Sequence, residues 1–202
     1  AQIEPHYQGF LDREIDSPEQ LETWLIDLGL FDAYVGETGA MLYVAMTCDT
    51  EDESVKAAYL DFVETVEPDL AKMGDLLNRK FSDNPHADAL DSSQYAVLLR
   101  DTRMDLALFR EENIELGTQL TKLGTRYSEI CGAMGVEFEG EERTMQQMGL
   151  FLQVNDRKRR EAAWRTITER RFTDADEIDD LFEQMIALRH QVAENAGYEN
   201  YR

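Results

Sequence analysis

The chain has 202 residues, of which 42 are acidic and 20 basic, giving a formal net charge of −22. This length suits one domain or slightly more, and 43% apolar residues can supply a core. The charge disfavours nucleic acid as a partner, because every phosphate contact would be made in a repulsive field. No apolar run approaches the roughly 18 residues needed to span a bilayer, so we expect no membrane partner.

The N-terminal sequence has neither the basic start nor the apolar stretch of a signal peptide. Two cysteines, Cys48 and Cys131, are too few for a disulfide framework, and each is expected to be a small buried apolar residue. Together these features predict a cytoplasmic location.

The first predicted helix begins at Ser17, which can cap it, with Gln20 placed to complete a capping box. Apolar residues then recur at spacings of three and four. The pattern continues to Met46, although Gly36 and Gly39 weaken it.

Three further helices are predicted over about 52–82, 92–112 and 116–134. Pro68 lies inside the first of these and should kink it, because proline removes a backbone donor. Each helix has one apolar face, as expected for antiparallel helices that pack together.

Residues 136–144 differ from the rest, since apolar and polar residues alternate there up to a glycine, which predicts a small β-hairpin. A short helix over 145–153 should follow. Asn155 and Thr173 are candidate N-caps for the last two helices, and Gly197 is placed as a helix stop. The predicted fold class is therefore all-α, mainly antiparallel helices, with one small β-hairpin near 136–144.

Metal chemistry has little support among the three histidines, because the chain has no His-Glu-x-x-His motif. His190 and Glu194 lie four residues apart on one predicted helix. They can be two ligands of a metal site completed from elsewhere, or simply a side-chain pair on a helix surface.

Two charged clusters are candidates for binding. Four glutamates at positions 137, 139, 141 and 142 surround the hairpin, where they can meet a cation or form a solvated turn. Seven of the twenty basic residues lie between Arg157 and Arg171, and Arg157, Arg160, Trp164 and Arg171 fall near one helical face. That face can dock an acidic partner or a peptide carboxylate, or its cations can pair with neighbouring acidic helices.

Several sequence segments between about residue 8 and the end resemble, in the same order along the chain, the N-terminal part of the oligoendopeptidase F-like zinc metallopeptidases, relatives of thimet oligopeptidase. The pieces are residues 43–50 (YVAMTCDT), 108–113 (LFREEN), 138–142 (FEGEE), 144–148 (TMQQM), 160–165 (REAAWR), 169–171 (ERR) and 188–202 (LRHQVAENAGYENYR). The last block is the most specific of them.

The resemblance implies a mostly helical peptidase that encloses a deep cleft and hydrolyses short peptides. In that family, zinc is held by the two histidines of a His-Glu-x-x-His helix and a downstream glutamate, and the motif glutamate is the general base. No residue of this chain matches a zinc ligand or the base, so no catalytic or metal residue is assigned, and substrate-binding residues stay unassigned.

We therefore expect residues 1–202 to be the noncatalytic N-terminal helical region of a larger peptidase, forming one wall of its substrate cleft. The hairpin would offer an edge strand to an extended peptide. Zinc and the C-terminal catalytic domain would belong to the rest of the same polypeptide, and this chain alone should bind no zinc and be inactive. Exposed apolar faces would allow a homodimer.

Two alternatives stay open. The chain can be a stand-alone helical protein–protein interaction domain with no catalytic activity, docking a partner through a cleft face or through the Arg157–Arg171 helix. It can also be a complete enzyme with a metal site at His190 and Glu194.

Overall fold

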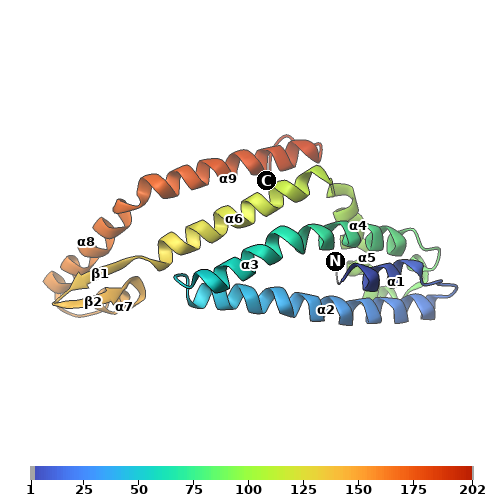
Figure 1. The fold of residues 1–202 in the computed structure, drawn as a ribbon, viewed down its shortest axis with the longest axis horizontal. Helices are drawn as coiled ribbons and strands as arrows, with labels where there is room; N and C mark the ends of the chain where they lie inside the picture. Colours follow the sequence, from blue (N-terminus) through green and yellow to red (C-terminus); the bar gives the residue numbers. More distant parts are fainter. Residues whose placement is uncertain (1–2, 202) are drawn as a thin grey trace. The chain divides into compact units, whose positions relative to one another are not determined.

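The computed structural model describes residues 3–201 and consists of helices with one two-stranded antiparallel sheet (Figure 1). The predicted fold class is confirmed. The chain divides into two compact units. Unit 1 contains residues 1–119 and 189–202, and unit 2 contains residues 120–188.

The elements of unit 1 begin with α1 (Glu4–Asp12), α2 (Pro18–Cys48), α3 (Glu53–Thr65), α4 (Glu67–Ser82), the 3-10 turn η1 (Ala87–Ala89) and α5 (Ser92–Leu108). Two long helices, α6 (Glu112–Gly132) and α9 (Ala175–Asn195), run from one unit into the other. Unit 2 adds β1 (Gly135–Phe138), β2 (Glu141–Thr144), α7 (Met145–Phe151) and α8 (Arg157–Thr173).

The long helix α2 begins as predicted, because the Ser17 hydroxyl accepts a hydrogen bond from the Gln20 backbone N–H. The Gln20 side chain reaches back one residue further than expected and accepts from the Asp16 N–H at 2.7 Å. Neither Gly36 nor Gly39 interrupts the helix. Packing of α2 alongside α3 outweighs the low helix propensity of two glycines (Figure 1).

The main core of unit 1 forms around Trp24, whose side chain is fully buried and whose indole N–H donates to the Phe10 carbonyl at 3.0 Å. Its other buried members come from α1, α2, α4, η1 and α5. They are Tyr7, Leu21, Leu77, Phe81, Ala87 and Leu99. The sequence patterns did not predict α1, a nine-residue helix without a side-chain cap. It is held by Tyr7 in this core and by Lys80, which donates to the Leu11 carbonyl at 2.6 Å.

The predicted helix over 52–82 is divided into α3 and α4 at Val66, two residues before Pro68. Proline has no N–H to continue the α3 ladder, so the expected kink is a break between two helices. A small second core joins α2 to α3 here through Met46, Tyr59 and Val63.

One face of α2 packs in the core, and much of the opposite face is apolar but exposed. Five large residues form this exposed face, which we call the α2 stripe. They are Ile26, Leu30, Tyr34, Met41 and Val44. Their spacings of four, four, seven and three residues place them along one side of the helix.

Unit 2 has a core of its own, formed where the hairpin packs on α7 and α8. Its buried members are Val136, Phe138, Met148, Ala163 and Ile167. A further cluster of Ile130, Met134 and Leu181 joins α6 to α9 within this unit.

Several predicted helix boundaries are wrong, including the start of α6 at Glu112 instead of near residue 116, and three of the errors have an identified local cause. Helix α5 ends at Leu108 instead of near residue 112, because Phe109 is extended. Asp156, not Asn155, caps α8 by accepting from the backbone N–H groups of the second and third residues after it. Thr173 belongs to α8, where its hydroxyl donates to the Glu169 carbonyl at 3.2 Å.

Gly197 is confirmed as a helix stop. It has a φ of +86°, its N–H donates to the Glu194 carbonyl, and the Tyr198 N–H donates to the Ala193 carbonyl. This pair of bonds is the Schellman motif, in which glycine supplies the left-handed residue.

Candidate functional site: the hairpin of unit 2

The predicted hairpin is present over Gly135–Thr144, with Phe138 paired to Glu141 across a two-residue turn. Both turn residues have positive φ, +57° at Glu139 and +81° at Gly140. Two such residues define the type I′ turn, whose twist matches that of the flanking strands.

The sheet leaves two backbone edges available. In a two-residue hairpin the pair next to the turn exchanges hydrogen bonds and the next pair does not, so the pairing alternates along the strands. The register therefore directs the backbone N–H and C=O of Glu137 out of one edge and those of Glu142 out of the other. Both residues are exposed. Each edge can accept one extended segment by backbone hydrogen bonds.

One face of the sheet is anchored, which keeps these edges fixed on unit 2. The side chains of Val136 and Phe138 are buried against the core that contains Ala163 and Ile167 of α8. Thr144 and Gln147 then form a full capping box at the start of α7, directly after β2. The packing of β1 and the capped helix after β2 together fix the hairpin on unit 2.

Two arginines beside the turn lie over the aromatic ring of Phe151. The guanidinium carbons of Arg143 and Arg159 lie 4.8 and 4.9 Å from the centre of the Phe151 ring. Each arginine also pairs with a turn carboxylate, Arg159 through two hydrogen bonds to Glu139 and Arg143 through one to Glu141. The Arg159 hydrogen bonds hold the pKa of Glu139 below its ordinary value.

The predicted acidic cluster is therefore divided in two. Glu139 and Glu141 are neutralised by arginines, whereas Glu137 and Glu142 show no ion pair in the described part of the chain. Their carboxylates flank the free edges and can meet an ammonium group. The sequence pattern indicated the glutamates but not Phe151, because an aromatic ring between two cations has no short-range sequence signature.

A polar junction in unit 1 joins two of the sequence blocks that carry the family resemblance. Arg110 donates from Nε to the Asn195 carbonyl at 3.0 Å and from Nη2 to the Ala196 carbonyl at 3.3 Å. Asn113 donates to the Val192 carbonyl at 3.1 Å and accepts from the Asn195 side chain at 2.7 Å. The bonds from Arg110 satisfy two carbonyls at the end of α9, and the Val192 carbonyl accepts from Asn113 in addition to the Ala196 N–H.

Arg110 also donates to the Ala107 and Phe109 carbonyls at the end of α5. One guanidinium thus closes two helix ends, which explains why the chain leaves the helix at Phe109. The junction fixes where α9 ends, and so the direction in which residues 197–201 continue.

The other candidates are placed as follows. His190 Nε2 lies 3.3 Å from Glu194 Oε1 on the exposed side of α9, which is the surface pair that the spacing allowed. Cys48 is exposed, so the prediction that it is buried is wrong, and Cys131 is partly buried.

Among residues 3–201 no group of three or more His, Cys, Asp or Glu side chains is arranged to hold a metal ion. No helix in the described range has the length and apolarity of a membrane span.

These features define a helical domain that carries an anchored hairpin. The sequence profile of the Peptidase M3 N-terminal domain matches residues 1–109, more than half of the chain. The chain belongs to this family.

Solved structures share the fold over the whole chain. One is an X-ray structure of a proposed oligoendopeptidase F at 3.1 Å, with a TM-score of 0.91 and 23% identity over 99% of this chain. The others are PZ peptidase A with an inhibitor (TM-score 0.90, 21% identity) and a proposed oligoendopeptidase F from Bacillus anthracis (TM-score 0.90, 20% identity), each also covering 99% of this chain. The chain spans only 36%, 36% and 37% of these three structures in turn. No curated protein sequence matches it significantly.

Proposed function

We propose that this chain is the noncatalytic N-terminal region of a zinc-dependent oligopeptidase and forms one wall of its peptide cleft. Membership of the peptidase M3 N-terminal family supports the proposal, as does the likeness to structures almost three times longer. Zinc and the residues that ligate it would come from the catalytic part of the same polypeptide. His190 and Glu194 supply only two exposed donors, too few for a zinc site.

The observation that carries the role in peptide binding is the hairpin. It is the single sheet of the described chain, its inner face is anchored on α8, and both of its backbone edges are free. An extended peptide would add as a third strand at the Glu137 or the Glu142 edge. Its affinity would come from main-chain hydrogen bonds, with the neighbouring carboxylate favouring a positively charged peptide terminus.

Proline at the two edge positions tests this role. Because the N–H groups of Glu137 and Glu142 point outward, proline there removes an edge donor without removing a hydrogen bond between β1 and β2. We expect one of Glu137→Pro and Glu142→Pro to weaken binding of a short unstructured peptide at least tenfold, measured by calorimetry on the 202-residue chain. The matched alanine variant keeps the N–H and should lose less than threefold.

Amide chemical shifts show whether each variant keeps the hairpin. Wild-type affinity in both proline variants, with the hairpin intact, would contradict the edge-strand role. Zinc-dependent hydrolysis of a quenched fluorescent peptide by the chain alone would contradict the noncatalytic assignment, whatever the result at the edges.

The isolated chain is also proposed to pair with a second copy through the α2 stripe, because five large apolar residues lie exposed along one side of a single helix.

A further inference from the structure

Helix α8 is strongly basic in an acidic chain. Residues 157–173 contain seven basic and two acidic residues, a local surplus of five positive charges against a net charge of −22. Four of these cations form ion pairs or hydrogen bonds within unit 2. Arg159 pairs with Glu139, Arg160 donates to the Val154 and Asn155 carbonyls, Arg165 pairs with Glu161, and Arg170 pairs with Asp174.

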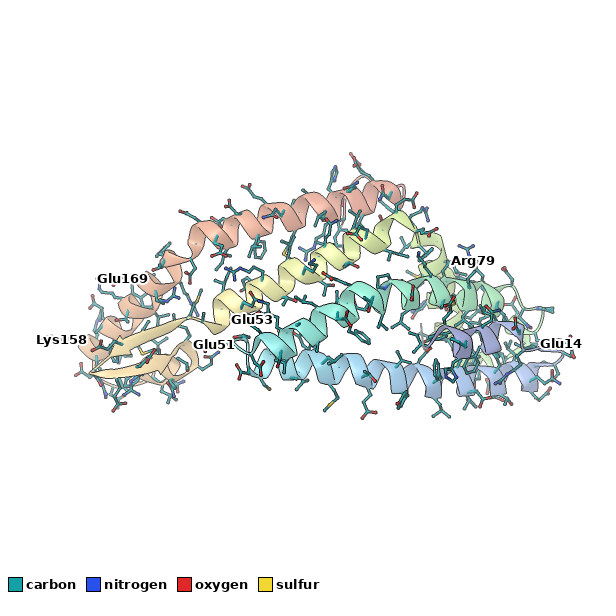
Figure 2. All side chains as sticks on the ribbon, in the orientation of Figure 1. Glu14, Glu51, Glu53, Arg79, Lys158 and Glu169 are labelled. Atoms are coloured by element: carbon teal, nitrogen blue, oxygen red, sulfur yellow. The ribbon has the colours of Figure 1, made fainter. Side chains whose placement is uncertain are left out.

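The remaining three cations, Arg157, Lys158 and Arg171, have no carboxylate within ion-pair distance in the described chain. Arg157 and Arg171 lie seven residues before and after Trp164, which is close to two helical turns in each direction. The side chains of Arg157, Trp164 and Arg171 therefore share one side of α8. Lys158 is rotated about a third of a turn away from them. Figure 2 labels Lys158 and Glu169 among the side chains that α8 projects.

Trp164 is 55% exposed and Phe172, which borders the same side, is 72% exposed. Neither is needed for the core of unit 2, because α8 packs on the hairpin through Ala163 and Ile167. Glu161, the acidic residue on this side, is already neutralised by two hydrogen bonds from Arg165, at 3.1 and 2.9 Å. We call Arg157, Trp164, Arg171 and Phe172 the α8 face.

Tryptophan and arginine are, with tyrosine, the residues most enriched among those that dominate binding at protein interfaces. Covering an exposed indole ring with a partner costs little free energy. Arginine binds a carboxylate through two parallel hydrogen bonds in one plane. The two arginines are separated by 14 residues of helix, or about 21 Å along its axis. This pattern matches a segment with an apolar centre and acidic residues about 20 Å apart.

We propose that the α8 face docks an acidic polypeptide segment, with carboxylates on Arg157 and Arg171 and an apolar side chain on Trp164. This interaction goes beyond the proposed peptidase role and is independent of the hairpin edges. A short acidic segment meets only the local positive field, because charges beyond about 10 Å are screened at moderate ionic strength. A long nucleic acid would extend past α8 into the field of an acidic molecule.

The two tryptophans give a direct readout. Trp24 is fully buried and Trp164 is exposed, so binding at the α8 face should shift the red-edge emission of Trp164 and leave that of Trp24 unchanged. The probe is a helix-forming peptide of 18 residues with glutamates 14 positions apart and leucine midway between them. A peptide with lysine in place of each glutamate is the charge control.

We expect micromolar affinity for the acidic peptide, falling at least tenfold when sodium chloride rises from 50 to 500 mM. Arg157→Ala with Arg171→Ala should weaken binding at least tenfold, and Trp164→Ala should weaken it to a similar degree, followed by calorimetry. Lys158→Ala removes an exposed cation on another side of the same helix and should change affinity less than threefold.

Three results would overturn the proposal. They are no binding of the acidic peptide by the wild-type chain, equal binding by the double arginine variant, and tighter binding of a single-stranded oligonucleotide at the same face. Trp24 emission and far-ultraviolet circular dichroism verify folding of each variant. Should the double variant fail to fold, the charge-control peptide on the wild-type chain decides, since binding as tight as that of the acidic peptide contradicts docking through carboxylates.

Discussion

Tyr7 and Asp32 form a partly buried polar contact at the edge of the main core of unit 1. The tyrosine hydroxyl donates to the Asp32 carboxylate at 2.8 Å. Burial raises the pKa of Tyr7 above its ordinary value, and the hydrogen bond and the negative charge of Asp32 raise it further. Burial also raises the pKa of Asp32, which the hydrogen bond from Tyr7 opposes.

Because the pKa of Tyr7 is raised, the free energy of unfolding should change with pH in the alkaline range. Above about pH 10 the unfolded chain releases its tyrosine protons while folded Tyr7 keeps its own, so the folded state binds more protons and the free energy of unfolding falls as pH rises. We expect Tyr7→Phe to reduce this fall. Urea unfolding followed by circular dichroism at pH 8, 10 and 11 measures it.

At pH 8 the same variant should lose about 1 kcal/mol, because the buried Tyr7 hydroxyl no longer donates its hydrogen bond to Asp32. Tyr34→Phe, at a tyrosine 70% exposed on α2, is the control and should follow the wild-type pH dependence. A Tyr7→Phe curve as steep as the wild-type curve between pH 10 and 11 would contradict the assignment.

Gly36 and Gly39, two of the three glycines of α2, have different surroundings. A Cβ on Gly39 would lie 2.9 Å from Cε1 of Phe62 on α3, whereas one on Gly36 would meet nothing within 4 Å. Gly39 thus allows α2 and α3 to approach closely, and Gly36 only lowers helix propensity.

Alanine substitution separates these roles. Gly36→Ala should raise the free energy of unfolding by about 0.5–1 kcal/mol through helix propensity. Gly39→Ala should lower it by about 1 kcal/mol, because the crowding of Phe62 outweighs the same gain. Thermal unfolding measures both.

A double variant, Gly39→Ala with Phe62→Leu, identifies the crowded partner. Its free energy of unfolding should be higher than the sum of the two single effects predicts, because the smaller side chain at position 62 relieves the crowding that alanine at position 39 creates. Strict additivity would show that Gly39 matters for another reason.

Sequence patterns predicted elements where one apolar face is long and capped, as in α2, and where alternation ends in a glycine turn, as in the hairpin. They failed where distant partners decide. Helix α1 depends on a core from four other elements, and the end of α5 depends on Arg110 binding carbonyls of α9, 85 and 86 positions away. The same reason hid Phe151 and its two arginines, which come together only when the hairpin packs on α7 and α8.

At the scale of the whole molecule, the α2 stripe is an exposed apolar surface that extends along much of one helix. The net charge of −22 and Glu37, which lies within the stripe, oppose self-association, so salt should favour it by screening. We expect the isolated chain to form dimers at tens of micromolar and more so at 500 than at 50 mM sodium chloride, by sedimentation velocity. This salt response is opposite in sign to that of the α8 face.

Leu30→Glu with Met41→Glu should give a monomer at both salt concentrations. Val97→Glu, at an exposed apolar residue of α5, is the matched control and should leave the dimer unchanged. A monomeric wild-type chain at 100 µM in high salt would contradict pairing through the stripe.

The division of the chain has a consequence for how such proteins diversify. Unit 2 is one continuous stretch, whereas unit 1 is assembled from the segments on either side of it. Asn113 holds the end of α9 beside the beginning of α6, so the chain leaves unit 1 and re-enters it through neighbouring helices. Unit 2 is therefore connected as a cassette, and the matched family profile, residues 1–109, lies wholly outside it. Such a cassette can be lengthened, exchanged or lost between homologous genes while the scaffold that carries it keeps its connectivity.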